Sequence, residues 1–205
     1  MTVGRFATRL THSLIGALMA VGLGSSPALA QDHDSHNMPS QQSVSTPESR
    51  ARENLLVEAV QNATRRFRNG VPPSAGQYFL GFGCVSGGDF GAMGLHFVNS
   101  KLIMDDEVLI DQPEILLYEP LPGGKIRLTR VDYLVAKKAW DANPAHHGPP
   151  TLNGQLFHLF DAPNRFGLDA FYTRHVWAWK DKPNGTFTNW NPNVSCDAFN
   201  VPDQN

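Results

Sequence analysis

Residues 115–136 read ILLYEPLPGGKIRLTRVDYLVA, which is two apolar runs joined by a turn. The turn, Glu119–Gly124, contains two prolines and two glycines, and this composition predicts a hairpin connection of the longer kind. We expect the flanking runs to form strands at Ile115–Glu119 and Lys125–Ala136. The stretch therefore indicates an antiparallel sheet.

Similar short apolar runs lie on both sides of this hairpin, divided by Gly, Pro, Asn and Asp. Further strands are expected at Gln77–Val85, Met93–Asn99, Gln155–Phe160 and Phe171–Trp179. Strands do not alternate with long helical patterns, which argues against a doubly wound parallel sheet. The predicted fold class is α+β, with an N-terminal helix packed on an antiparallel, bent or barrel-like sheet.

The predicted helix covers residues 47–69. Thr46 is a suitable N-cap, and Pro47 fits the first helical position. Apolar residues follow at helical spacing, at Leu56, Val60, Ala63 and Phe67. Asn69 and Gly70 supply the stop signal.

Residues 1–30 have the pattern of a secretory signal peptide. A positive start is followed by an apolar run and by the small residues Ala28 and Ala30, at positions −3 and −1 of a cut after Ala30. The run is shorter than the roughly 20 residues that a membrane span needs, so we expect no membrane span after signal removal. Residues 31–46 are expected to form a flexible polar tail, and 47–205 a single globular α+β domain. The predicted location is periplasmic or secreted.

Composition narrows the possible partners. The formal net charge of the 205 residues is −2, and only 18 % of residues are charged. A mildly acidic chain with scattered charges lacks the charge pattern of a nucleic-acid-binding protein. The expected partner is a small molecule or a metal ion, and the oligomeric state is left open.

The chain has two cysteines, Cys84 and Cys196. In an oxidising compartment such a pair predicts a disulfide. The alternative is a reactive thiol or a metal ligand, although no CxxC motif is present.

Several polar residues interrupt the apolar strand runs, and these are the candidates for chemistry. Two imidazoles and one carboxylate from different strands would form an open site for a divalent metal such as Zn²⁺ or Fe²⁺. We predict His96, Glu119 and His175 as the metal ligands, with Glu114 or Asp132 as substitutes. The alternative for a buried carboxylate is an ion pair with Arg127, Arg130 or Arg174, and for the histidines a structural role.

Aromatic residues and the mature N-terminus offer two further possibilities. Trp177 and Trp179 are candidate ligand-lining residues, together with Glu114 and Asp132, although packing alone would also explain the tryptophans. Cleavage after Ala30 would give a chain that starts at Gln31, with a histidine at its third position, His33. A free amine, two amides and this ring would suit Cu²⁺.

Several segments carry a family resemblance: Gly91–Asn99, Pro113–Pro120, His175–Pro183 and Asn191–Cys196. With these motifs the chain resembles a family of uncharacterised exported bacterial proteins, over most of residues 50–196. The resemblance implies bacterial export and one domain, and it leaves the mechanism open.

These observations predict an exported domain that binds a metal ion or small ligand in a sheet-lined pocket. One alternative is a metal-assisted hydrolytic or oxidative enzyme that uses His96, His175 and a carboxylate. The other is a structural or partner-binding envelope protein without chemistry.

Overall fold

The computed structural model describes residues 46–71 and 77–199. The predicted signal peptide and almost all of the predicted polar tail, including the Gln31–His33 copper site, lie outside these residues. Within them no helix is both long and apolar enough for a membrane span.

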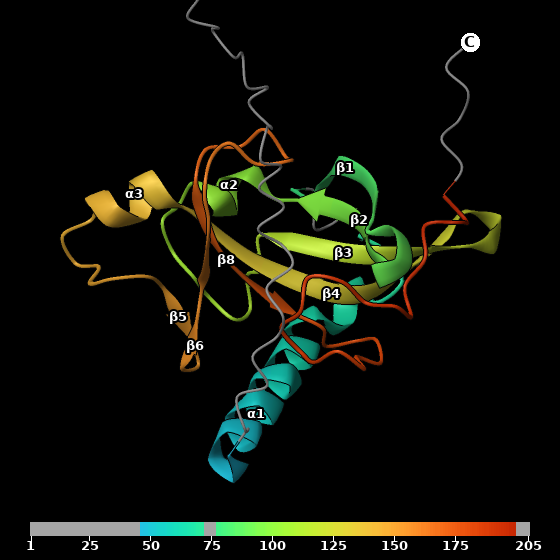
Figure 1. Cartoon of the computed structure of the whole chain (residues 1–205), viewed down its shortest axis with the longest axis horizontal. Helices are drawn as coiled ribbons and strands as arrows, with labels where there is room; N and C mark the ends of the chain where they lie inside the picture. The colour runs from blue at the N-terminus through green and yellow to red at the C-terminus, as the bar shows by residue number, and fades with distance from the viewer. Residues whose placement is uncertain (1–45, 72–76, 200–205) are drawn as a thin grey trace, which may run out of the picture. The chain divides into compact units, whose positions relative to one another are not determined.

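The prediction of an α+β fold with an N-terminal helix and an antiparallel sheet is confirmed (Figure 1). In chain order the helices and strands are α1 (Pro47–Thr64), β1 (Phe79–Ser86), β2 (Ala92–Val98), α2 (Ser100–Ile103), β3 (Ile115–Leu121), β4 (Lys125–Ala136), α3 (Lys137–Ala142), β5 (Thr151–Leu152), β6 (Gln155–Leu156), β7 (His158–Phe160) and β8 (Phe171–Val176).

The main sheet is open rather than barrel-like. Among the described residues it has six strands in the order β1-β2-β3-β4-β8-β7, and every neighbouring pair is antiparallel. The expected strand Gln155–Phe160 is divided in two: β6 forms a separate ribbon with β5, whereas β7 joins the sheet. The division falls at Phe157, which is buried and whose backbone N–H donates to the carbonyl of Pro150.

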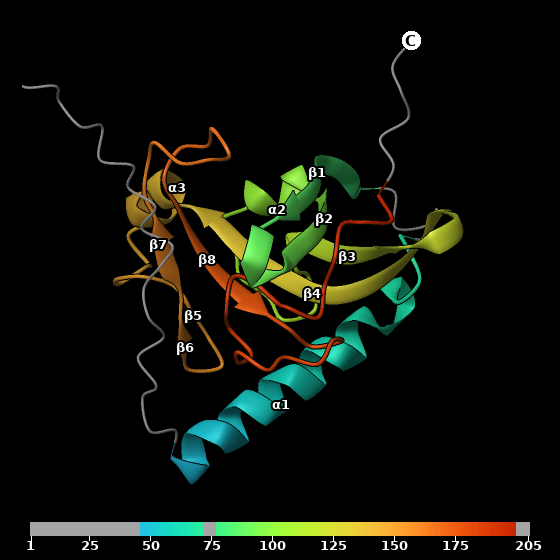
Figure 2. The same ribbon diagram turned by 45° about the vertical axis from the view of Figure 1, so that its right-hand side comes forward.

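Helix α1 covers one face of the sheet (Figure 2). Thr46 caps it by accepting a hydrogen bond from the backbone N–H of Ser49. The buried residues Leu56 and Val60 then pack in one hydrophobic cluster with sheet residues such as Tyr118 and Val131. A short 3₁₀ turn, Arg65–Phe67, continues the helix, so the predicted range of 47–69 is close to the observed one.

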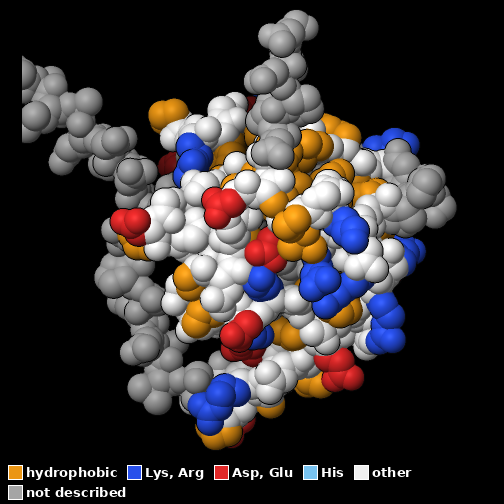
Figure 3. Space-filling model, turned by 90° about the vertical axis from the view of Figure 1, so that its right-hand side faces the viewer, with side chains coloured by type: hydrophobic (Ala, Val, Ile, Leu, Met, Phe, Trp, Pro, Cys, Tyr) orange, Lys and Arg blue, Asp and Glu red, His pale blue; other side chains and the backbone are white. Residues whose placement is uncertain are grey.

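Lys and Arg side chains gather on the face that Figure 3 shows. At the end of α1, Arg65 and Arg66 are exposed. Arg68 instead lies over the ring of Trp179, 4.3 Å from its centre. The indole N–H of Trp179 donates to the hydroxyl of Thr64, which ties the segment after β8 to the helix.

Strand alternation gives the opposite face of the sheet its own set of side chains. In β3, Leu116 and Tyr118 belong to the cluster under α1, whereas Ile115 and Leu117 belong to a second cluster. Leu134 of β4 and Phe171 of β8 join that second cluster. The face away from α1 therefore has its own apolar layer, and the polar residues discussed below are set into it.

The predicted disulfide between Cys84 and Cys196 is confirmed. It joins β1 to the C-terminal segment across 112 residues of sequence. The same segment also pairs with the sheet through a bridge between Asn191 and Ala92. These links hold residues 191–196 near β1 and β2.

Candidate functional site

A cavity lies on the sheet face opposite α1. The hollow measures about 410 Å³, which includes space open to solvent. The walls are mostly apolar, and the lining residues are Phe82, Met93, His96, Ile115, Arg130, Asp132, Leu134, Phe160, Phe166, Leu168, Phe171, Thr173 and His175.

Three polar residues of this cavity form a chain of contacts across β4 and β8. Arg130 and Asp132 are two residues apart on β4, so their side chains share a face of the sheet. Arg130 Nη2 donates to Asp132 Oδ2 at 2.7 Å. Asp132 is paired in register with His175 of β8, and its Oδ1 lies 3.0 Å from His175 Nδ1. The last contact is close but poorly aligned for a hydrogen bond.

The Arg130 guanidinium is wholly buried and well held. Its Nη1 donates to the carbonyl of Asn189 at 2.6 Å, and the group lies over the Trp177 ring, 4.8 Å from the ring centre. Burial would raise the pKa of Asp132, but Arg130 and His175 outweigh it and lower that pKa to about 2. The pair is therefore fully ionised at neutral pH, and its charges cancel.

His175 lies in this cavity as a neutral ring. Burial lowers its pKa, Arg130 and Arg174 lower it further, and Asp132 opposes them. With the Asp132 carboxylate beside Nδ1, the proton of the neutral ring belongs on Nδ1. Nε2 then carries the lone pair, and it is buried without a hydrogen-bond partner among the described residues.

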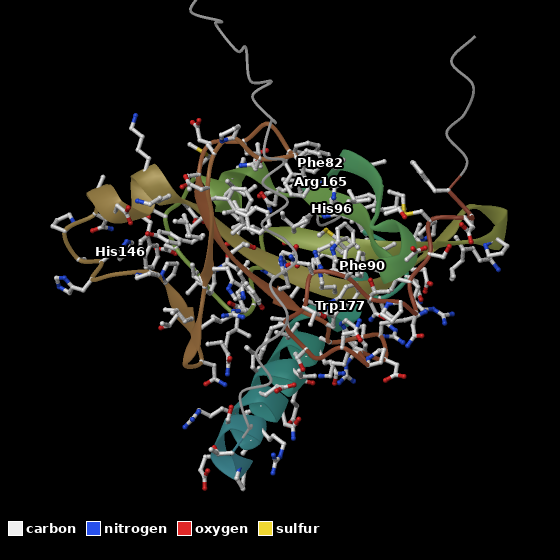
Figure 4. All side chains as sticks on the ribbon, viewed as in Figure 1. Phe82, Phe90, His96, His146, Arg165 and Trp177 are labelled. Atoms are coloured by element: carbon white, nitrogen blue, oxygen red, sulfur yellow. A yellow bond between two sulfur atoms is a disulfide. The ribbon has the colours of Figure 1, made fainter. Side chains whose placement is uncertain are left out.

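His96 contributes a second neutral imidazole from β2. Its Nδ1 lies 3.0 Å from the carbonyl oxygen of Gly94. A carbonyl only accepts, so the proton is on Nδ1 and the lone pair is on Nε2. Burial is the main cause that lowers the pKa of His96 to about 4, and Arg130 adds to it. Figure 4 shows His96 beside Phe82, whose ring centre is 6.0 Å away.

Gly94 sets the local path of β2. Its φ of +97° is rarely accessible to other residues, and a Cβ here would lie 2.4 Å from the carbonyl oxygen of Tyr118. The pairing of β1 with β2 is also irregular, with register shifts on either side of Phe82. These irregularities place both Met93 and His96 on the cavity side, although three positions separate them in sequence.

A loop between β7 and β8, residues 161–170, covers the cavity. Phe166 packs against Phe82 and His96, with ring centres 5.5 Å and 6.4 Å away. The Asn164 side chain holds the loop together by bonding the backbone of Asp161, Phe166 and Leu168. Arg165 extends over the Trp190 ring.

The structure brings some of the predicted site residues together and separates others. His96, His175 and Asp132 line one cavity, so the carboxylate beside the histidines is Asp132 rather than Glu119. Glu119 accepts a hydrogen bond from Lys180 at 2.7 Å and is not a lining residue. Glu114 is buried nearby and accepts from the backbone N–H of Leu134.

The two tryptophans also lie outside the lining of the cavity. Trp177 packs under Arg130, and its indole N–H donates to the carbonyl of Thr188. Trp179 lies against α1. Among the described residues no group of three or more His, Cys, Asp or Glu side chains has the arrangement of a metal site.

Sequence reasoning missed the cavity walls supplied by Phe82 and Phe166. Phe166 in the otherwise mostly polar loop 161–170 was a usable signal, because an apolar ring in such a loop is expected to pack against other apolar residues. Arg130 appeared only as one of three possible partners for a buried carboxylate. Its spacing of two from Asp132 could have identified it.

Comparison of the chain with protein-family models, curated proteins and solved structures gives no match. The resemblance to exported bacterial proteins stays a prediction. The geometry of the cavity is therefore the basis for a functional proposal.

Proposed function

We propose that the chain is an exported domain that binds a small ligand and that the cavity below loop 161–170 is its binding site. The observation that carries the proposal is His175 Nε2, a buried acceptor in the wall of an apolar hollow that has no partner within residues 46–71 and 77–199. An unsatisfied buried acceptor costs roughly 1–3 kcal/mol. A ligand that donates a hydrogen bond to it recovers that cost.

The lining indicates the chemistry of the ligand. The Arg130 charge is balanced by Asp132, and both imidazoles are neutral, so the cavity has no net charge to attract an ion. The lone pairs on Nε2 of His96 and of His175 favour an O–H or N–H donor. The phenylalanine, leucine and isoleucine walls favour an apolar body. The ligand class is a small neutral molecule with one donor group.

The predicted divalent metal, Zn, Fe or Cu, has weaker support. Two imidazole nitrogens reach one cavity, but both oxygens of the carboxylate beside them already face Arg130 and His175. A metal would need one of these contacts to break. The metal prediction is checked by elemental analysis of protein that is purified without a histidine tag.

The ligand proposal is tested with phenol and toluene, which differ by one donor group. Ligand-observed NMR titration of the wild type should show phenol binding at least about tenfold more tightly than toluene, as expected when one buried acceptor is satisfied. The His175→Leu variant should lose this preference. His146→Leu is the control, because His146 lies beside α3, away from the cavity (Figure 4). Equal affinity of the wild type for the two probes would contradict the proposal.

A further inference from the structure

The cavity contains a base together with the group that would stabilise its charged form. Asp132 Oδ1 lies 3.0 Å from His175 Nδ1, and Arg130 holds the other Asp132 oxygen at 2.7 Å. The negative charge of a carboxylate beside Nδ1 favours the tautomer that leaves Nε2 free, and it stabilises the imidazolium that forms when Nε2 takes a proton. Nε2 of His175 is buried and has no hydrogen-bond partner among the described residues.

We propose that His175 Nε2 is a general base that removes a proton from a small neutral molecule bound in this cavity. Asp132 is its positioning residue. This inference rests on the proposed function, because it requires that the cavity takes up a ligand.

The proton transfer balances without another reactant. A C–H or O–H bond of the ligand breaks, its electron pair stays on the ligand, and the proton bonds to Nε2. The same proton then returns to a second atom of the ligand or is lost after a leaving group departs, so the reaction class is isomerisation or elimination. Negative charge that develops on the ligand faces Arg130, which lines the cavity and whose Nε–H has no partner among the described residues.

The charges around His175 agree with this role. Asp132 and Arg130 face it from β4, His96 from β2 and Arg174 from its own strand; His158 of β7 also interacts with it. Burial lowers the pKa of His175, so the ring is neutral at neutral pH and Nε2 carries its lone pair. Only Asp132 carries a negative charge within this set, and it lies at the nitrogen opposite the reacting one.

The test uses 5-nitrobenzisoxazole, a small neutral aromatic molecule that isolates proton removal. A base takes its ring C–H proton, the N–O bond breaks, and a coloured cyanophenolate forms without water, metal or oxidant. Wild-type protein should accelerate this reaction saturably, at least about 100-fold more than His175→Gln, as general bases in proteins do. His146→Gln should retain the wild-type rate.

Two further measurements keep the test decisive if His175→Gln does not fold. The wild-type rate should rise with pH along one titration with a midpoint below 6.5, the ordinary pKa of histidine. In Asp132→Asn this midpoint should move, which loss of packing alone would not cause. A flat pH profile in the wild type would overturn the inference.

Failure of the inference and failure of the proposed function give different results. Binding of the probe is measured by the broadening of its own NMR lines. If the probe binds saturably but reacts at the same rate in His175→Gln, then His175 is not the general base, and the proposed binding site is retained. If the probe does not bind to the wild type at all, both are wrong.

Discussion

At the scale of single residues, the site depends on one buried ion pair. Arg130 is wholly buried, and Asp132 is the acid that neutralises it. Removing one partner of such a pair leaves an uncompensated charge in the protein interior, and this costs more than the intact pair contributes. The pair therefore belongs to the stability of the fold as well as to the cavity.

We expect Asp132→Asn to lower the free energy of unfolding by about 3–5 kcal/mol, because Arg130 loses its counter-charge. Urea unfolding at pH 7 measures this. Asp141→Asn is the matched control: Asp141 pairs with Lys137 at the surface, where ion pairs contribute little. Equal effects of the two substitutions would contradict the assignment.

Glu114 gives a pH-dependent prediction. Burial raises its pKa to about 9, so the folded protein keeps this carboxyl protonated while the unfolded chain ionises above about 4.5. The protonated Glu114 side chain makes its full contribution to the free energy of unfolding below pH 4.5. As pH rises from 4.5 towards 9 this contribution is lost, by at most about 1.4 kcal/mol per pH unit. Glu114→Gln cannot ionise, so its stability relative to the wild type should increase from pH 5 to pH 8. A pH-independent difference in urea unfolding would exclude this origin.

At the scale of elements, the strong local patterns were sufficient for prediction. The strand Lys125–Ala136 has the predicted bounds. Its apolar run begins after the glycine turn and ends where the polar residues Lys137 and Lys138 follow. Two short helices were missed, α2 and α3. Each is too short for an apolar period, and α2 is set by the Asn99 side chain, which accepts from two backbone N–H groups.

The site was only partly predictable, because it depends on how the strands pair with one another. His96 and His175 interrupt apolar strand runs, and both are buried in the structure. Which carboxylate would meet them depends on register between strands, and register is shifted by bulges that sequence does not reveal. Asp132 is directly opposite His175, whereas Glu119 is opposite Arg127 and pairs with Lys180.

The β2 irregularity makes Gly94 a testable position. In Gly94→Ala the new Cβ would collide with the Tyr118 carbonyl in addition to the strain of positive φ. Gly123→Ala is the control, since Gly123 also has positive φ but has nothing within 4 Å of a Cβ. We expect about 1 kcal/mol of destabilisation in the control and at least twice that in Gly94→Ala, by urea unfolding. Similar losses in both variants would show that the close approach is unimportant.

At the scale of the whole molecule, the C-terminal segment supports the site from outside the sheet. Asn189 accepts from Arg130, and the segment is fixed to β1 by the disulfide between Cys84 and Cys196. A bridge across 112 residues removes much of the freedom of the unfolded chain. It also holds the Asn189 carbonyl in place.

Reduction of this disulfide should lower the free energy of unfolding by about 2–5 kcal/mol. Thermal unfolding with and without a reductant measures the change. The double variant Cys84→Ser, Cys196→Ser should resemble the reduced wild type and should not respond to reductant. An unchanged melting temperature of the wild type after full reduction would contradict the role of the bridge.

The proposed site requires a particular protonation state of the His175 ring, which ¹⁵N NMR of histidine-labelled protein observes directly. At pH 7 we predict a neutral His175 with the proton on Nδ1 and a free lone pair on Nε2. Addition of phenol should shift the Nε2 resonance as a hydrogen bond forms. A charged ring, a proton on Nε2, or an Nε2 resonance that phenol leaves unchanged would contradict the proposed site.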